Sequence, residues 1–401
     1  MVVTLGSYNN TPKRITILGS TGSIGCNTLD LVGCNPTNYI VEVLTANSNV
    51  KLLAKQAIKT GARLAVIGDE SLYIPLMDAL KNSDTEVAAG RNALVEAASR
   101  PVDWVMSAIV GAAGLQPTLA AINTGAVIAL ANKECLVCAG EYMLSEIKKS
   151  GATILPVDSE HNAIFQVFET EKRNSIERII LTASGGPFWG SSLNKMKNAT
   201  PEEAVAHPNW NMGPKISIDS ATMMNKGLEL IEAHYLFSME ESKIDVLIHL
   251  ESIVHSLVSY VDGSVLAQLG FPDMRTPIAY TLGWPNRIKT PGTRLDLASI
   301  GTLSFERPNP DLFPAIDLAR HALSLGGSAP AVLNAANEVA VEAFLRKKIN
   351  FLDIIKIVES TLNSCEAKEI SSLADLISAD KESRIIAAER VTECAVKVRN
   401  S

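Results

Sequence analysis

Apolar and polar residues in the first part of the chain form short β-rich runs that alternate with segments of helical spacing. Apolar residues three or four positions apart indicate helices around 70–81, 91–99 and 114–123. Alternating strands and helices predict a parallel, doubly wound sheet, and therefore a Rossmann-like α/β domain at the N-terminus. The strands are predicted at 14–18, 39–45, 64–67, 104–109 and 126–131.

The pattern changes after this first part. A strand at 178–182 leads into a long Asn-, Pro- and Gly-rich loop, a strand ending near Ile218 follows, and Asp219 or Ser220 is predicted to cap a helix that runs to about Phe237. Further strands are joined by a hairpin at Asp262–Gly263, and the chain from Phe313 onward has helical spacing throughout. We predict a Rossmann-like domain, a central α/β catalytic domain with a lid loop, a linker and a C-terminal helical bundle, with these bounds: 1–157, 158–290 (lid about 185–215), 291–312 and 313–401.

Composition narrows the class of function. The 401 residues carry a net charge of −7, which disfavours a general nucleic-acid surface and leaves small-molecule chemistry open. No apolar run has the length needed to cross a bilayer, so no membrane association is expected. The first residues contain neither an apolar signal region nor an Arg- and Ser-rich transit sequence, so a cytoplasmic protein is expected.

The run GSTGSIG lies between the first predicted strand and the first predicted helix. Its glycines, Gly19, Gly22 and Gly25, would permit a tight turn and close approach of the backbone to a pyrophosphate. The spacing is GxxGxxG, so a plain glycine turn is the alternative.

The end of the next strand bears on cofactor choice. An enzyme that prefers NAD usually carries an acid there, about 20 residues past the glycines, to hold the ribose 2′-hydroxyl. This chain has Asn47, Ser48 and Asn49, with Lys51 close by, and no acid. The pattern favours NADP over NAD, although a polar turn that caps the following helix would look the same.

The stretch TILPVDSEHNAIF, residues 153–165, lies at the junction between the two halves. In an extended segment side chains repeat every two residues, so Asp158 and Glu160 would point the same way, and Ser159 would face away. Two carboxylates on one side suit a cation such as Mg²⁺ or Mn²⁺. The alternative is a polar turn with two solvated acids.

Three further clusters carry candidate chemistry. Asn132, Lys133 and Glu134 follow a strand end, where ligands bind in such sheets, or form only a helix cap with a solvated Lys–Glu pair. The turn at Ser184 could hold an anion such as phosphate, or could be an ordinary turn. Asn225, Lys226 and Glu229 share one helix face, so they could bind a phosphate and complete the cation site, or form a solvated pair. Gly227 in that helix could admit a ligand or another backbone.

Taken together, these stretches resemble the 1-deoxy-D-xylulose 5-phosphate reductoisomerase family over nearly the whole chain. The motifs that carry the resemblance are GSTGSIG, ANKE, VDSEHNAIFQ, TASGGPF, HPNWNMGPKISIDSATMMNKGLELIEA, GSVLAQLG, PDMRTPI and LNAANEVAV. The resemblance implies a homodimer that converts 1-deoxy-D-xylulose 5-phosphate to 2-C-methyl-D-erythritol 4-phosphate in the non-mevalonate isoprenoid pathway. It implies NADPH and a divalent metal, Mg²⁺ or Mn²⁺ with Co²⁺ as a further candidate.

The same resemblance implies roles for individual residues. The metal ligands would be Asp158, Glu160 and Glu229, which together with Lys133 and His207 would form the catalytic set. The residues that contact substrate would be Lys133, Ser159, Glu160, Ser184, His207, Trp210, Met212, Ser220, Asn225, Lys226 and Glu229. The residues along NADPH would be Gly19, Thr21, Gly22, Ser23, Ile24, Gly25, Asn47, Ser48, Asn49, Asn132, Glu134 and Gly213.

Two other functions are compatible with parts of the sequence. One is an NADP-dependent oxidoreductase that acts on another phosphorylated sugar without isomerisation, which an assay in reverse with the authentic product would distinguish. The other is a non-catalytic nucleotide sensor, which loss of any of Asp158, Glu160, Glu229 or Lys226 would favour; all four are present.

Overall fold

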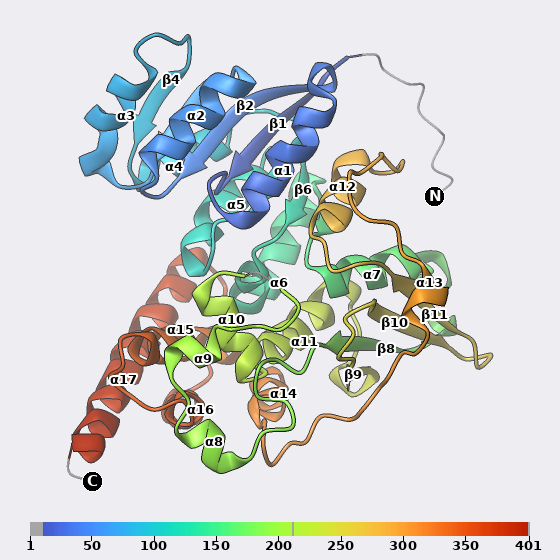
Figure 1. Ribbon diagram of the computed structural model, residues 1–401. Coiled ribbons are helices and arrows are strands. Elements are labelled where there is room, and N and C mark those ends of the chain that lie inside the picture. The colour runs from blue at the N-terminus through green and yellow to red at the C-terminus, as the bar shows by residue number, and fades with distance from the viewer. Residues whose placement is uncertain (1–10, 211, 400–401) are drawn as a thin grey trace. The chain divides into compact units, whose positions relative to one another are not determined.

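The computed structural model describes residues 11–210 and 212–399. The chain forms two compact units, and each contains segments that are distant in sequence (Figure 1). The first unit holds the chain up to Ala131 together with 146–155 and 278–290, and the second holds the remainder. Three separate segments of the chain therefore belong to the first unit. The domain boundaries predicted at 157, 290 and 312 stay a prediction.

The first unit is built on a seven-stranded sheet with the order β4-β3-β2-β1-β5-β6-β7. The described pairings from β4 through β6 are all parallel, as the alternating pattern predicts. Strand β4 was not predicted, because its four residues at the sheet edge lack an apolar run. The strands are β1 Lys13–Leu18, β2 Tyr39–Ala46, β3 Leu64–Ile67, β4 Glu86–Ala89, β5 Trp104–Ser107, β6 Val127–Leu130 and β7 Thr153–Pro156.

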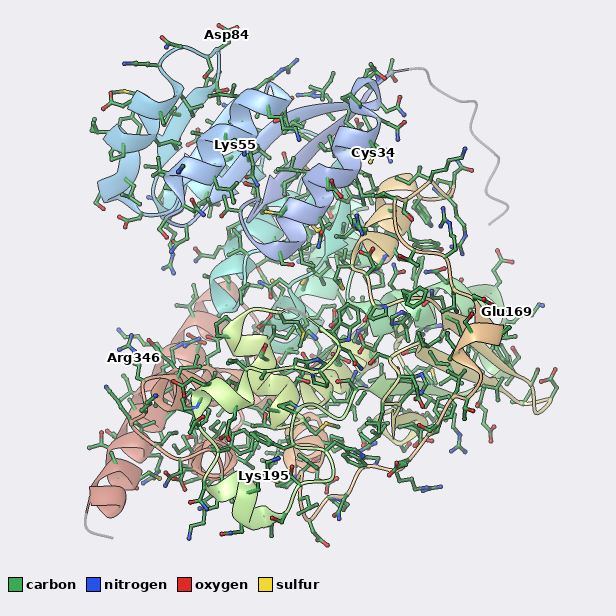
Figure 2. All side chains as sticks on the ribbon, in the orientation of Figure 1. Cys34, Lys55, Asp84, Glu169, Lys195 and Arg346 are labelled. Atoms are coloured by element: carbon green, nitrogen blue, oxygen red, sulfur yellow. The ribbon has the colours of Figure 1, made fainter. Side chains whose placement is uncertain are left out.

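Helices connect these strands, as expected for a doubly wound fold. They are α1 Ser23–Cys34, α2 Val50–Thr60, α3 Tyr73–Leu80, α4 Arg91–Ala98 and α5 Leu115–Ile122. Helix α12, Arg275–Gly283, contributes its C-terminal turns to the same unit. There the indole of Trp104 donates to the carbonyl of Thr281 at 3.1 Å, and the ammonium of Lys13 donates to the carbonyl of Leu282 at 2.9 Å. These two bonds explain why 278–290 belongs with the first unit. Lys55 and Asp84, two exposed charged residues of the first unit, are labelled among the side chains in Figure 2.

The second unit combines a four-stranded sheet, of order β11-β10-β8-β9, with helices. Strand β8 pairs parallel with β9 and antiparallel with β10, and β10 pairs antiparallel with β11 across the predicted hairpin. The strands are β8 Ile176–Ala183, β9 Ile244–Ile248, β10 Val254–Tyr260 and β11 Val265–Leu269. The helices are α6 Lys133–Ser150, whose start belongs to this unit, α7 Ser159–Val167, α8 Leu193–Lys197, α9 Pro201–Ala204, α10 Pro214–Ala221, α11 Met224–Phe237, α13 Leu297–Ile300, α14 Ala315–Leu325, α15 Ala329–Leu345, α16 Asp353–Ser364 and α17 Leu373–Arg399.

One apolar core joins the sheet and the helices of the second unit. Leu181 of β8, Leu228 of α11 and Phe344 of α15 are all buried in it. Helix α11 contains Gly227, where an added Cβ would lie 3.0 Å from the carbonyl oxygen of Ala315 on α14. The glycine therefore admits a neighbouring backbone, one of its two predicted uses.

The strand predicted to end near Ile218 is wrong. Residues 214–221 form helix α10, with Pro214 at its first position, and Asp219 and Ser220 lie inside it. Helix α11 begins after Met223, whose φ is +63°, so neither residue is its cap. The short run ISI looked like a strand, yet Ser217 and Asp219 are as buried as Ile218. Because polar residues are buried here too, the polarity of three positions cannot distinguish the two-residue repeat of a strand from the 3.6-residue repeat of a helix.

No helix in the described part of the chain is both long and apolar enough to cross a bilayer.

Candidate active site

Three carboxylates from two elements of the second unit lie together. Asp158 is the N-cap of α7, Glu160 lies in the first turn of that helix, and Glu229 lies on α11. One oxygen from each lies within 4.8 Å of the others. The predicted grouping is confirmed, but the argument from strand alternation is wrong, because helix α7 begins at Ser159. Three hard oxygen donors around one point fit Mg²⁺ or Mn²⁺.

Two buried lysines neutralise part of this negative charge. Lys133 Nζ forms an ion pair with Asp158 and lies 3.0 Å from Oε1 of Glu229. Lys226 Nζ lies 2.9 Å from Oε1 of Glu160 and also pairs with Glu229. Three carboxylates therefore face two ammonium groups. Lys133 and Glu134 are not a solvated pair, since both are buried and each binds other partners.

The pKa values of Glu229, Glu160 and Lys133 respond to this crowding. Burial, with the charge of Glu160, raises the pKa of Glu229 to about 7. Burial acts in the same direction on Glu160, but Lys226 and Lys133 outweigh it and hold its pKa well below the usual range. Burial also opposes the charge of Lys133, yet Asp158 and Glu229 raise the pKa of its ammonium well above the usual value. A divalent cation would favour the ionised form of Glu229, which the fold alone leaves partly protonated near neutral pH.

Ser159 and Asn225 belong to the same cluster. The hydroxyl of Ser159 donates to Oε2 of Glu160 at 2.6 Å, so it does not face away from its neighbours as strand alternation required. Asn225 donates to Oε1 of Glu229 and accepts from Lys133 Nζ at 2.8 Å. The predicted shared face of Asn225, Lys226 and Glu229 is confirmed.

A second polar group surrounds the Ser184 turn. The ring of His207 accepts at Nδ1 from the backbone N–H groups of Asn209 and Trp210, at 3.1 and 3.0 Å. The neutral ring therefore carries its proton on Nε2, 2.7 Å from the Ser184 hydroxyl, which accepts it. Burial lowers the pKa of His207, which favours this neutral form.

The same turn packs directly against α10. Gly186 has a φ of +68°, and a Cβ there would lie 2.7 Å from the carbonyl oxygen of Ser220. The structure thus brings Ser184 and Ser220, two predicted phosphate residues, to adjoining segments. The bonds described for Asn225 and Lys226 go instead to the carboxylate cluster.

The predicted lid is partly ordered by its own turns. Helix α9 has a capping box between Thr200 and Glu203, and α8 was not predicted. The side-chain amide of Asn209 donates to the Leu250 carbonyl and the Ser252 hydroxyl at 2.7 and 3.0 Å. The ring of Trp210 lies 6.3 Å from that of His255, centroid to centroid. Met212 is half-buried, while Asn211 lies outside the described residues.

The glycine loop of the first unit has the predicted tight geometry. Gly19 has a φ of +84°, and a Cβ there would lie 2.6 Å from the Ala108 carbonyl oxygen. A Cβ on Gly25 would lie 2.4 Å from the Gly19 carbonyl oxygen. Gly22 caps α1, and the exposed or half-buried Thr21, Ser23 and Ile24 lie at its start. The loop follows β1, where the strand order reverses, which is the place where such sheets bind ligands.

The other predicted cofactor residues lie at helix starts. In the first unit, Asn49 caps α2 by accepting from Leu52 N at 3.1 Å, beside Asn47 and Ser48, and this cap is compatible with a contact to NADPH. In the second unit, Asn132 accepts from Cys135 N at 3.2 Å at the start of α6, and Gly213 caps α10. Glu134 binds Lys215 at 2.8 Å.

Sequence reasoning missed a buried pair behind the carboxylates. His161 Nε2 lies 2.9 Å from the Glu229 carbonyl oxygen, to which it donates, and its Nδ1 lies 3.5 Å from Oε2 of Glu232. Burial lowers the pKa of His161 to about 4 and raises that of Glu232 well above its usual range. Asp158, His161 and Glu232 form a second group with metal-ligand spacing. The one signal in the sequence was the position of His161 beside Glu160.

A parallel sheet with a glycine turn at its switch point, together with a unit holding a carboxylate and lysine cluster, defines a dinucleotide-dependent, cation-using α/β enzyme. Three family models match the chain: 1-deoxy-D-xylulose 5-phosphate reductoisomerase over 15–140, its C-terminal domain over 154–237, and DXP reductoisomerase C-terminal domain over 269–386. The chain belongs to the 1-deoxy-D-xylulose 5-phosphate reductoisomerase family.

Individual relatives support this assignment. The reductoisomerase of Rhodospirillum centenum is 59% identical over 94% of this chain and 94% of its own, and that of Zymomonas mobilis is 56% identical over 94% and 97%. A solved structure of the Zymomonas mobilis enzyme in complex with NADPH matches with a TM-score of 0.90 at 55% identity, covering 95% of this chain and 99% of that one. A DOX-P reductoisomerase in complex with NADPH, fosmidomycin and magnesium matches with a TM-score of 0.90 at 46% identity, covering 95% and 98%.

Proposed function

We propose that the chain converts 1-deoxy-D-xylulose 5-phosphate to 2-C-methyl-D-erythritol 4-phosphate, using NADPH and a divalent metal. The observation that carries this proposal is the convergence of Asp158, Glu160 and Glu229 on one point, with Lys133 among them. The solved relatives bind NADPH and magnesium. A sensor that only binds nucleotide would have no use for such a cluster, since buried like charges are costly.

Asp158, Glu160 and Glu229 would hold the cation. When bound, it would polarise the ketone oxygen of the substrate as a Lewis acid, and NADPH would supply hydride to the rearranged aldehyde. Lys133, fixed between Asp158 and Glu229, would bind a substrate hydroxyl, and so would Ser159 beside Glu160. These contacts would align the reacting carbons before the carbon skeleton shifts.

The phosphate end of the substrate is proposed to bind Ser184, Ser220, Asn225 and Lys226. The first two lie on adjoining segments, and the latter two lie on the first turn of α11. His207, through its bond to Ser184, would orient that hydroxyl. His207, Trp210 and Met212 would close over the substrate, and excluding water would protect the reactive aldehyde.

NADPH is proposed to lie along the glycine loop and the turn after β2. Gly19, Gly22 and Gly25, with Thr21, Ser23 and Ile24, would approach the pyrophosphate. Asn47, Ser48 and Asn49 contain no acid that would repel a 2′-phosphate. Asn132, Glu134 and Gly213 would complete the site. This part of the proposal rests on the family resemblance and on the backbone geometry of each segment taken separately.

The protein is further proposed to be a cytoplasmic homodimer. Strand β11 lies at the edge of its sheet, and Val265 and Leu266 on it are 51% and 43% exposed. An exposed edge strand with apolar side chains is a ready surface for pairing with a second copy. Light scattering of wild type and of Leu266→Lys would test this, since a charge on the edge should favour the monomer.

The decisive test follows the absorbance of NADPH with 1-deoxy-D-xylulose 5-phosphate, with and without Mg²⁺. Turnover that requires both the sugar and the metal is expected. Folded wild type that binds NADPH but does not oxidise it would contradict the proposal. The alternative oxidoreductase would instead fail in reverse with authentic 2-C-methyl-D-erythritol 4-phosphate.

A further inference from the structure

A network of largely buried polar side chains links helix α15 to the segments that carry the site. We call Asn337, Asp219, Lys215 and Glu134 the α15–α10–α6 network, after the helices that it joins. Asn337 is fully buried on α15, and its amide donates to Oδ1 of Asp219 at 2.8 Å. Asp219, 1% exposed, lies on α10. The first link therefore joins two helices of the second unit that are 118 residues apart in sequence.

The α15–α10–α6 network continues through one lysine. Lys215 Nζ lies 2.8 Å from Oδ2 of Asp219 and 2.8 Å from Oε1 of Glu134, on the first turn of α6. Burial opposes the charge of Lys215, but Asp219 and Glu134 raise the pKa of its ammonium well above the usual value. Lys215 is therefore held as a cation between two carboxylates, and it ties α10 to α6.

Each carboxylate of the α15–α10–α6 network lies next to a residue that is proposed to contact substrate. Glu134 follows Lys133, which binds Asp158, Asn225 and Glu229. Asp219 precedes Ser220, whose carbonyl oxygen packs against Gly186 in the Ser184 turn. Fixing Asp219 and Glu134 to one ammonium therefore fixes the segments that carry Ser220 and Lys133 relative to each other.

Stability alone is a weak reason for such an arrangement. Buried ion sets often contribute less than apolar side chains of similar volume would, because of their desolvation cost. They do fix geometry, since a buried charge that loses its partner is strongly unfavourable. At metal sites, groups that orient the direct ligands typically change metal affinity or activity by about 10- to 100-fold when removed, and we expect a comparable effect from groups that orient substrate contacts.

We propose that Asn337, Asp219 and Lys215 are positioning residues for substrate binding, which hold Ser220 and Lys133 at the separation that the phosphorylated sugar requires. Through Asn337, the C-terminal helices become part of the site although none of their residues need touch substrate. This inference rests on the proposed roles of Ser220 and Lys133.

The same helix offers a matched control. Asn334, one turn before Asn337, is equally buried, but its amide donates to Cys138 Sγ at 3.4 Å and to Oε1 of Glu338 at 3.2 Å. Asn334→Leu and Asn337→Leu remove the same groups from the same helix. A purely structural role predicts that both variants lose stability and neither loses substrate affinity selectively.

The experiment compares both variants with wild type by thermal unfolding, steady-state kinetics and calorimetric titration with 1-deoxy-D-xylulose 5-phosphate. We expect Asn337→Leu to raise KM and the calorimetric Kd about tenfold, with kcat changed less than about threefold, and Asn334→Leu to change neither constant appreciably. Equal Kd increases in both variants, or an unchanged Kd in Asn337→Leu, would overturn the proposal.

A rescue pair sharpens the result. Asn337→Asp would place two carboxylates face to face, so its Kd should rise more than that of Asn337→Leu. Adding Asp219→Asn restores an amide-to-carboxylate bond with the partners exchanged, and should recover most of the affinity. No recovery in a folded double variant would count against the proposal. Wild type that binds the sugar phosphate without turnover would contradict the proposed function and leave the Kd comparison valid.

Discussion

The glycine loop of the first unit and the carboxylate cluster of the second unit differ in the kind of atoms on which they depend. The loop relies on backbone: Gly19 and Gly25 lie so close to neighbouring backbone that no side chain fits. The cluster relies on side chains brought together over long separations, as when Lys133 meets Glu229 across 96 residues. A backbone site should be sensitive to bulk and tolerant of charge, whereas a side-chain site should show the reverse.

The largest expected effect is on the side-chain site. Glu229→Gln keeps the volume but removes one of three proposed cation ligands, so kcat/KM should fall by about 10²- to 10³-fold with a weaker Mg²⁺ dependence. Glu232→Gln is the control, because Glu232 is equally buried one turn later on α11 and its raised pKa makes the neutral amide a close substitute. An equal loss in Glu232→Gln would point to the Asp158, His161 and Glu232 group as the cation site.

The next effect is on stability against pH, in protein freed of divalent cations. The pKa of Glu229 is about 7 in the folded protein against 4.5 ordinarily, so the folded state keeps a proton that the unfolded chain loses. Glu229 should therefore contribute a loss of stability as pH rises from about 4.5 to about 7, of up to about 3 kcal/mol. His161 acts in the opposite direction over nearly the same range, because its pKa is about 4 in the folded protein against 6.5 ordinarily. The contribution of Glu229 is therefore read from the difference between the two proteins: thermal unfolding should show stability changing more favourably with rising pH in Glu229→Gln than in wild type. Glu160, whose pKa is lowered, titrates below the range.

Substitutions that add a side chain to a glycine test the glycine loop. A Cβ at position 25 would overlap the Gly19 carbonyl oxygen, so Gly25→Ala should weaken NADPH binding by about 30-fold, roughly 2 kcal/mol. Gly33→Ala lies on the same helix with nothing within 4 Å of its Cβ, and should leave the Kd unchanged. NADPH fluorescence measures both. Equal Kd values for the two variants would remove the claim that the loop depends on close backbone approach.

A smaller loss is expected at the Ser184 turn. Ser184→Ala removes one proposed phosphate contact and the partner of His207, so KM should rise about tenfold with kcat nearly unchanged. Thr182→Val removes a buried hydroxyl from strand β8, which leads into this turn, where the hydroxyl donates to the carbonyls of Val254 and His255. It should lower the melting temperature without raising KM. A larger KM increase in Thr182→Val would mean that strand β8, rather than Ser184, limits binding.

The smallest effect concerns cofactor choice. Asn47→Asp places an acid after β2, where it would repel a 2′-phosphate and accept a 2′-hydroxyl. The ratio of kcat/KM for NADPH to that for NADH should fall by about threefold to tenfold, or about 1 kcal/mol. An unchanged ratio would show that the turn at 47–49 does not lie at the ribose.

The two regions also differ in how far the sequence predicts them. The strands and the glycine loop follow from local pattern, because each depends on neighbours within a few residues. The grouping of Asp158 and Glu160 was predicted correctly from an incorrect strand geometry, because a turn into a helix also brings nearby residues together. Residues 216–218 were wrongly predicted to form a strand, because polar side chains there are as buried as apolar ones and the polarity pattern does not show which positions face the core.

Long-range partners were beyond local reasoning. Lys215 meets Glu134 across 81 residues, and Asn337 meets Asp219 across 118. In the sequence, Asn337 is only a polar residue on an apolar helix, and Lys215 is a lysine in a loop-like run. Which carboxylate each would find depends on the packing of α6, α10 and α15, and no spacing rule encodes that packing.

The threefold entry of the chain into the first unit has a consequence for synthesis. A ribosome delivers β1 to β6 first, but the sheet gains β7 only after the whole of α6, and Trp104 finds its acceptor at Thr281 across 177 residues. The first unit is therefore completed only after the proposed metal ligands have been made. The nascent N-terminal segment would expose β6 as an open sheet edge until β7 is made, and Trp104 would lack its carbonyl acceptor until α12 has emerged.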